Sequence, residues 1–470
     1  MSNKKYRILV CTDAINAKGG YSRIGAKILE ALHGAGHEVS QLAWYHKNNP
    51  PIHRPWTTYT TFKDHTACCN RGYPIVEAFL ENRIRYIGLD KNNVPISADR
   101  DGVYCPRGRR MNNDQYGHSS INLVAAIFKP EIVITIGDQW MCQSAHICQA
   151  RNTFVHIMYA AVDGEPLPRF TQRAGHFLDW QELYMKTEYP IAYCEWAKDT
   201  ANTMVGEDVV KEVIPFGVNS SIFKSISSTA RKELRLSDSH GFVSVGRTTG
   251  CVMWNMWNPK PDDFNILYVG RNIQRKNIPF MFETIAEFKK RGYETDRRIK
   301  FLMHMPFHDN GWNMDELIRQ FDAYEWVLVN PSVSPGVGPE DRELNEIYNL
   351  ADVHLHMSAA EGYDIPNLES LSAGVITTAM DYSAPPSWGG DVLQLIDPII
   401  IRQEPMTNLG RAYPDVGHAA EVLNRIYCMP MEEKTKLWAK GRILAEKLSW
   451  NKFRDNWVNL IDRVEIPNNE

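Results

Sequence analysis

Two glutamates, Glu361 and Glu369, are the residues whose type and spacing suggest chemistry most directly. An ionised carboxylate only accepts hydrogen bonds, and without a metal its two oxygens suit a pair of neighbouring hydroxyls on a ligand. Two such carboxylates, one in a loop and one on the helix that we expect to follow, can each hold a diol. The pair therefore points to a ligand with hydroxyls at both of its ends.

The elements that must position these glutamates are a strand, a loop, a helix and a second strand. Residues 351–357 predict the first strand, and residues 375–380 predict the second. Between them Asp364 can cap the helix, Pro366 suits its first turn and Gly374 suits its end. The N–H groups of such a loop and helix start attract phosphate. Hydroxyls at both ends with phosphate between them describe a nucleotide-sugar, and acidic residues that only complement a helix dipole are the simpler alternative.

The segment from Glu361 to Glu369 resembles the Glu-x7-Glu motif of retaining glycosyltransferases with the GT-B fold, specifically glycosyltransferase family 4. Ser358 before it and Ser372-Ala373-Gly374 after it are similar to the family pattern. The resemblance implies an α/β protein in which two Rossmann-like, doubly wound domains face a cleft. It also implies transfer of a sugar from a nucleotide-diphosphate sugar, the co-substrate, to an acceptor hydroxyl with retention of configuration. Neither a metal nor another cofactor is expected.

A second segment resembles the same family. Gly270-Arg271 and Lys276 match the family's Gly-Arg followed by Lys, whose side chains clamp the donor diphosphate. Fixed cations stabilise the negative charge that the diphosphate gains when the sugar leaves. The resemblance assigns the ribose hydroxyls to Glu369 and the hydroxyls of the transferred sugar to Glu361. The backbone amides expected at the diphosphate belong to Gly362, Tyr363, Asp364 and Ile365.

The N-terminal residues predict a βαβ unit. Residues 7–13 and 38–43 are typical of strands, and residues 21–32 are typical of an amphipathic helix between them. Gly19 and Gly20 at the turn allow a ligand to approach the backbone closely. The turn lacks the full G-x-G-x-x-G dinucleotide fingerprint, but it resembles the glycine loop that faces the donor phosphates and the acceptor in family 4.

Three further candidates lie in or just after predicted strands. Asp138 and Asp163 each follow an apolar run, and ligands sit at the carboxyl ends of parallel strands. His156 lies within its run and is more typical of a core histidine, although we keep it among the acceptor-side candidates. A mechanism with a covalent sugar intermediate needs a carboxylate beneath the sugar, which Asp163 or Asp138 would have to supply. The catalytic candidates are Glu361, Asp163, Lys276 and Arg271.

Residues 45–120 interleave basic and aromatic side chains over irregular sequence. They include Arg107, Arg109 and Arg110, and residues 1–130 hold about 18 Lys and Arg against about 10 Asp and Glu. Such a segment can line the site of an anionic acceptor, nucleic acid included, as in viral enzymes that glycosylate modified DNA bases. A solvated insertion is an equally good interpretation.

Length and composition indicate a cytoplasmic protein of two domains. The 470 residues exceed one ordinary core, and no apolar run approaches the roughly 18 residues of a membrane helix. The first residues enter a strand directly, unlike a signal peptide, and nine cysteines without regular spacing suggest reduced thiols. We expect one domain over residues 1–215 with a crossing helix at 447–464, and the other over 216–446.

Three other functions share parts of this pattern. A nucleotide-sugar epimerase on the same fold would need no acceptor, and a non-catalytic binding module would not turn the donor over. A glycoside hydrolase would not need the diphosphate clamp. The family reads the nucleobase at the loop of residues 330–338, whereas residues 383–391 depart from its pattern. The sugar, the nucleotide and the acceptor therefore stay open.

Overall fold

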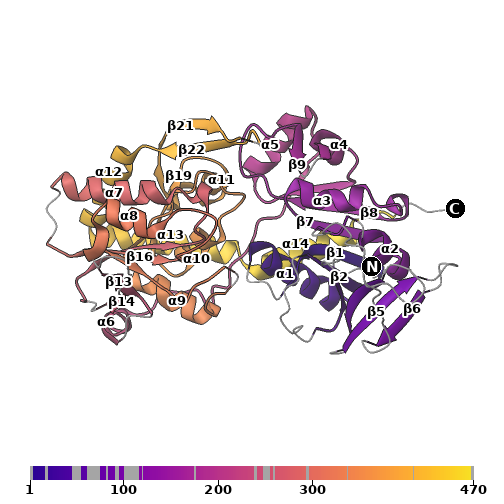
Figure 1. Ribbon diagram of the computed structural model, residues 1–470, viewed down its shortest axis with the longest axis horizontal. Helices are drawn as coiled ribbons and strands as arrows, with labels where there is room; N and C mark the ends of the chain where they lie inside the picture. The colour runs from indigo at the N-terminus through magenta and orange to yellow at the C-terminus, as the bar shows by residue number, and fades with distance from the viewer. Residues whose placement is uncertain are drawn as a thin grey trace.

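The computed structural model describes residues 4–15, 19–44, 54–60, 75–80, 83–89, 95–99, 116–118, 120–173, 176–237, 241–246, 254–257, 260–292, 296–335, 337–405 and 407–466. These residues form two halves, each built around a β-sheet with helices packed on it (Figure 1).

The first sheet has the strand order β12-β11-β8-β7-β1-β2-β3-β4-β5-β6. Neighbours from β12 to β3 pair in parallel, whereas β3 to β6 pair antiparallel. The central strands β1, β7 and β8 are buried along nearly their whole length, as in a sheet covered on both faces. The bounds are β1 (Arg7–Asp13), β2 (Glu38–Trp44), β3 (Thr57–Thr60), β4 (Ile75–Leu80), β5 (Arg83–Leu89), β6 (Pro95–Asp99), β7 (Ile132–Gly137), β8 (Val155–Ala160), β11 (Tyr189–Ala192) and β12 (Glu212–Val213).

The second sheet has the order β14-β13-β17-β16-β15-β18-β19-β20. Strands β17 to β20 pair in parallel, and β13 joins β17 and β14 antiparallel. Its strands are β13 (Val243–Val245), β14 (Trp254–Met256), β15 (Phe264–Val269), β16 (Ile299–His304), β17 (Val327–Val329), β18 (Val353–His354), β19 (Ile376–Met380) and β20 (Gln394–Ile396). Two separate hairpins are formed by β9 (Phe170–Arg173) with β10 (His176–Asp179) and by β21 (Pro398–Gln403) with β22 (Gly410–Pro414).

Helices α1 to α5 belong to the first half, and α6 to α13 belong to the second (Figure 1). Their bounds are α1 (Gly20–Gly34), α2 (Ser120–Phe128), α3 (Gln139–His146), α4 (Trp180–Met185), α5 (Glu195–Val205), α6 (Ser228–Ser237), α7 (Ile278–Lys290), α8 (Met314–Gln320), α9 (Asp341–Leu350), α10 (Ile365–Ser372), α11 (Ala384–Gly389), α12 (Val416–Cys428), α13 (Met431–Lys447) and α14 (Trp450–Asp462). None of the helices within the described ranges has the length and apolarity that a membrane-spanning segment needs.

The last helix returns to the first half. Helix α13 packs on α10, whereas α14, drawn in yellow, packs on α1 (Figure 1). Phe453 and Trp457 of α14 contact the ring of Tyr159, with ring centroids 6.4 and 5.2 Å apart respectively. Because these rings are buried, α14 completes the core of the first half. The domain boundaries at residues 215 and 446 stay a prediction.

Candidate active site

The loop after β18 places Glu361 in a buried cluster of charges. Oε1 accepts from Nζ of Lys276, and Oε2 lies 2.8 Å from Nη1 of Arg275. Both cations come from the short turn Gln274–Lys276 that follows β15. Burial alone would raise the pKa of Glu361, but the charges of Arg275 and Lys276 hold it well below its usual range. Glu361 is therefore an ionised acceptor between two fixed cations.

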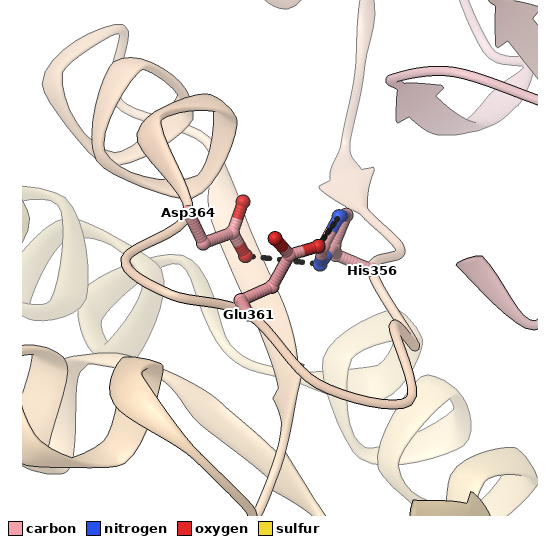
Figure 2. A group of neighbouring side chains, drawn as sticks. All are labelled: His356, Glu361 and Asp364. Atoms are coloured by element: carbon pink, nitrogen blue, oxygen red, sulfur yellow. Dashed lines mark ion pairs between the residues drawn. The ribbon is translucent and has the colours of Figure 1, made fainter. Parts of the chain in front are cut away.

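His356 and Asp364 lie beside Glu361 and are also buried (Figure 2). Nδ1 of His356 lies 2.9 Å from Oδ2 of Asp364, and its Nε2 lies 3.8 Å from Oε1 of Glu361. The three side chains offer potential metal ligands within 4.8 Å of one another. Both oxygens of Glu361 already face a cation, however, so a divalent ion would meet the charges of Lys276 and Arg275 at close range. The arrangement fits a network of ion pairs better than a metal site.

Glu369, on α10, faces the first half of the molecule. One oxygen accepts from Arg23 on α1, and the other accepts from the hydroxyl of Tyr348 on α9 at 3.1 Å. Arg23 also lies 3.3 Å from Asp341, the first residue of α9. Burial raises the pKa of Glu369, and the charge of Arg23 opposes this shift. Both oxygens of Glu369 thus have a partner within the protein, so a ligand hydroxyl would have to replace one of them.

Asp163 lies three residues after β8 and links the two halves. Its backbone oxygen accepts from Nη1 of Arg411, whose Nη2 donates to Glu404 at 2.6 Å. The carboxylate lies 3.5 Å from Nη1 of Arg411 and 4.0 Å from Nε of Arg275. Asp163 is therefore held between two guanidinium groups, which suits a positioning role more than that of an unpaired nucleophile.

Three neighbouring strands of the first sheet carry an aspartate at their carboxyl ends. Asp13 ends β1, Asp138 follows β7 and Asp163 follows β8. Oδ1 of Asp138 accepts from the hydroxyl of Tyr21 at 2.7 Å. Oδ1 of Asp13 is buried without a partner among the described residues, and burial raises the pKa of Asp13 to about 6. Sequence reasoning missed Asp13, although the strand-end rule that selected Asp138 applies to it equally.

The glycine turn lies beside Asp13. A side chain added at Gly19 would come 3.8 Å from Oδ2 of Asp13, and one at Gly20 would meet no described atom within 4 Å. The start of α1 therefore has open space at Gly20, and the binding of a ligand at this turn stays a prediction.

Arg271 does not join Lys276 at Glu361. Its side chain is 56% exposed and makes two hydrogen bonds of 2.9 Å to Asp309. Arg275 takes the position beside Glu361 instead. This residue was missed from the sequence, although its place directly before Lys276 in the same turn is a signal that could have found it.

The loop that leads into α10 brings its four predicted residues to the helix start. Gly362 packs against the first half, because a side chain there would come 3.4 Å from Cβ of Ala161. Tyr363 is buried, Asp364 has a left-handed backbone with φ 80°, and Ile365 begins α10. The loop can therefore contact a ligand mainly through its backbone and less through these side chains.

His156 is a core residue, and its assignment to the acceptor side is corrected. The ring is fully buried, with Nε2 2.9 Å from Oγ1 of Thr135 and Nδ1 3.4 Å from Oγ1 of Thr187. Burial lowers its pKa well below the usual value. Its hydrogen-bonding capacity is used inside the sheet. Of the other acceptor-side candidates, Asp138 accepts from Tyr21, whereas Arg107, Arg109 and Arg110 lie outside the described residues.

A cavity of about 480 Å³ opens beside the loop of residues 330–338, where we expect a nucleobase. His304, at the end of β16, lines it, and so does Ile347 on α9. His304 is buried, its Nδ1 has no partner among the described residues, and burial lowers its pKa to about 4.

The chain is similar to known proteins in structure, whereas its sequence alone matches none of them. No family model matches the sequence, and no curated protein matches it. The chain is similar to sucrose-phosphate synthase from Thermosynechococcus elongatus, with 14% identity over 98% of this chain and 99% of that one and a TM-score of 0.61. It is also similar to an α,α-trehalose-phosphate synthase (UDP-forming) from Burkholderia vietnamiensis, with 11% identity, 99% and 98% coverage and a TM-score of 0.63.

A third similar structure is the catalytic domain of starch synthase IV from Arabidopsis thaliana, solved with ADP and acarbose. It has 10% identity to this chain, coverage of 98% of this chain and 99% of that one, and a TM-score of 0.59. These matches span nearly the full chain and both sheets. The protein therefore has the GT-B fold, as its motif predicted. At such low identities the likeness shows the fold alone.

Proposed function

We propose that this protein is a glycosyltransferase that moves a sugar from a nucleotide-diphosphate sugar to an acceptor hydroxyl with retention of configuration. The observation that carries the proposal is the arrangement of Glu361, Lys276 and Glu369 around the start of α10. It combines an ionised acceptor, a fixed cation, a helix N-terminus and a second carboxylate in one region of a GT-B protein. Membership of glycosyltransferase family 4 is part of this proposal and rests on the resemblance of the Glu361–Glu369 segment, of Gly270-Arg271 with Lys276 and of the glycine turn.

Each part of this arrangement suits one part of the donor. The diphosphate would bind Lys276 and Arg275, the two cations beside Glu361, together with the N–H groups at the start of α10, because all of these groups attract phosphate. Glu369 would accept from the ribose hydroxyls after Arg23 moves away. Glu361 would accept from the hydroxyls of the sugar, since the diphosphate would attract the cations that now hold it.

The proposed transfer needs no protein nucleophile. The sugar–phosphate bond breaks while the acceptor oxygen approaches from the same face, and the leaving diphosphate takes the acceptor's proton. Lys276 and Arg275 stabilise the charge that develops on the diphosphate. Since these side chains balance that charge, we propose that a metal is not required.

The acceptor is proposed to bind to the first half through hydroxyls. Asp13, Asp138 and Asp163 line the carboxyl ends of β1, β7 and β8, and carboxylates accept from hydroxyls but repel phosphates. These carboxylates give no support to a nucleic-acid acceptor, although two guanidinium groups balance the charge of Asp163. Salt-sensitive retention of the protein on DNA would instead favour that acceptor.

A thermal-shift screen against UDP-, GDP-, ADP-, CDP- and TDP-sugars, with and without EDTA, tests the donor site. One similar protein is described as UDP-forming and another was solved with ADP, so these two nucleotides come first. A ligand that binds only the folded state raises the Tm. We expect one selective rise that EDTA does not remove. A well-folded sample that responds to none of these donors would contradict the proposal.

A further inference from the structure

Asp364 has an unusual conformation for a residue that precedes a helix. Its φ of 80° and ψ of 70° are ones that glycine adopts without strain and that aspartate adopts at a cost. The residue is 5% exposed, and its side chain does not cap α10. A buried carboxylate on a strained backbone needs a compensating contact.

His356 supplies that contact (Figure 2). Its Nδ1 lies 2.9 Å from Oδ2 of Asp364, which makes this a close ion-pair contact, and neither oxygen of Asp364 has a hydrogen-bond partner of good geometry among the described residues. The imidazole is 1% exposed and stacks on the ring of Tyr268, with centroids 5.9 Å apart and planes 21° apart. The plane of the His356 ring is thus fixed by packing, and its Nδ1 lies against the carboxylate of Asp364.

The other edge of the ring identifies its tautomer. Nε2 of His356 lies 3.5 Å from Nζ of Lys276. A lysine ammonium group only donates, so Nε2 must accept and the ring proton must be on Nδ1, where the negative charge of Asp364, 2.9 Å away, favours it. An imidazolium would instead bring a third positive charge beside Lys276 and Arg275.

We infer that His356 and Asp364 form a positioning pair for Lys276. Asp364 holds the proton of His356 on Nδ1, and the lone pair that this leaves on Nε2 orients the ammonium group. Lys276 then directs one N–H to Glu361, one to His356 and a third to a ligand. The inference deepens the proposed function and rests on it, because that ligand is the donor diphosphate.

The test compares two double variants that differ in one hydrogen-bond acceptor. His356→Leu alone would leave the carboxylate of Asp364 buried without a partner and would lower the Tm. Asp364→Gly removes both this carboxylate and the backbone strain, so His356→Leu/Asp364→Gly is expected to regain stability. His356→Gln/Asp364→Gly is its matched control, because the glutamine amide oxygen can again accept from Lys276.

Calorimetric titration with the nucleoside diphosphate of the donor that stabilises the natural protein gives the readout. We expect His356→Leu/Asp364→Gly to bind it roughly 10- to 100-fold more weakly than the natural protein. The glutamine variant should bind it roughly 10-fold more tightly than the leucine variant, because the two proteins share the change at Asp364 and differ only in the acceptor offered to Lys276. Equal affinities of the two double variants would overturn the inference. A natural protein that binds no nucleotide would contradict the proposed function instead.

Nitrogen NMR of histidine-labelled protein tests the tautomer without any ligand. The signals of His356 are assigned by their loss in His356→Gln/Asp364→Gly. We expect a protonated Nδ1 and an unprotonated Nε2. A proton on Nε2, or on both nitrogens, would overturn the inference even if the donor site is correct.

Discussion

At the scale of single residues, the carboxylate that each cation contacts decides whether that cation can bind the donor diphosphate in the proposed site. Lys276 and Arg275 both contact Glu361, whereas Arg271 is exposed and contacts Asp309. A buried cation that faces the diphosphate stabilises the leaving group, while an exposed ion pair is screened by solvent. We therefore expect unequal roles for these three side chains.

Lys276→Ala and Arg275→Ala should each lower kcat/KM for the donor by roughly 10- to 1000-fold, because each removes a charged contact to the diphosphate. Arg271→Ala is the matched control and should change it by less than about 3-fold. Steady-state release of nucleoside diphosphate measures all three. A loss for Arg271→Ala as large as that for Lys276→Ala would favour the clamp that the family pattern implies.

Asp13 should make stability depend on pH. Its folded pKa of about 6 lies above the ordinary value near 4, so the folded state binds the proton more tightly than the unfolded state. The tighter proton binding stabilises the folded state fully below about pH 4, and this contribution to the free energy of unfolding is lost as the pH rises through about 6. Asp13→Asn should therefore be more stable than the natural protein at pH 7.5, by on the order of 2 kcal/mol.

Scanning calorimetry at pH 4 and pH 7.5 checks this prediction for Asp13. The two proteins should unfold at nearly the same temperature at the lower pH and differ at the higher one. The same difference at both values would show that the carboxylate of Asp13 does not titrate in this range.

The sequence predicted the site residues whose roles follow from local spacing. Lys276 contacts Glu361, and Glu369 lies on the helix expected after that loop, whereas the roles of these residues at the donor stay a prediction. The role of His356 depends on Lys276 and that of Arg411 on Asp163, which lie far away in the chain, and a single sequence carries no signal for such contacts. His156 was misplaced because a strand position does not reveal that Thr135 and Thr187 satisfy its ring.

At the scale of elements, buried parallel strands were the most predictable. The strand expected over residues 7–13 is β1, and the helix expected over residues 21–32 is the longer α1. By contrast, β4, β5 and β6 lie within residues 45–120, whose irregular pattern predicts no strands. These strands pair antiparallel at the edge of the sheet, where continuous apolar runs are not required.

Gly217 lies in the segment between β12 and α6. It should be essential where this segment passes the start of α14. A side chain there would overlap the backbone of Ser449 and Trp450, which cannot move without displacing α14. Gly217→Ala should destabilise the protein by about 1–3 kcal/mol or more. Gly34→Ala, at a helical site with no described atom within 4 Å, is the control and should be neutral or stabilising. Equal Tm values for the two variants would show that a side chain at residue 217 can be accommodated beside α14.

At the scale of the whole molecule, polar contacts join the two halves across the proposed substrate site. Arg23 binds Glu369, and Arg411 binds Asp163. The hydroxyl of Tyr382 donates to the backbone oxygen of Glu165 at 3.2 Å and accepts from its N–H at 2.9 Å. Because Arg23 occupies the carboxylate proposed to bind ribose, donor binding and the separation of the halves should be coupled.

Arg23→Met should bind the donor nucleotide more tightly, by up to about 10-fold, because the ribose no longer competes with the guanidinium group for Glu369. Arg54→Met is the control, since Arg54 pairs at 3.1 Å with Glu30 on the same half. Calorimetric titration compares them, and small-angle scattering should show a larger radius of gyration for Arg23→Met. Weaker nucleotide binding by Arg23→Met would mean that Arg23 contacts the donor itself.

The configuration of the transferred sugar tests the central claim most directly. The protein is incubated in EDTA with the donor that stabilises it and a set of hydroxyl acceptors, and proton NMR of the product reads the anomeric coupling. The account predicts release of nucleoside diphosphate together with a glycoside of the donor's own anomeric configuration, and loss of both in Lys276→Ala. An inverted product, or no product from a donor that binds, would contradict it.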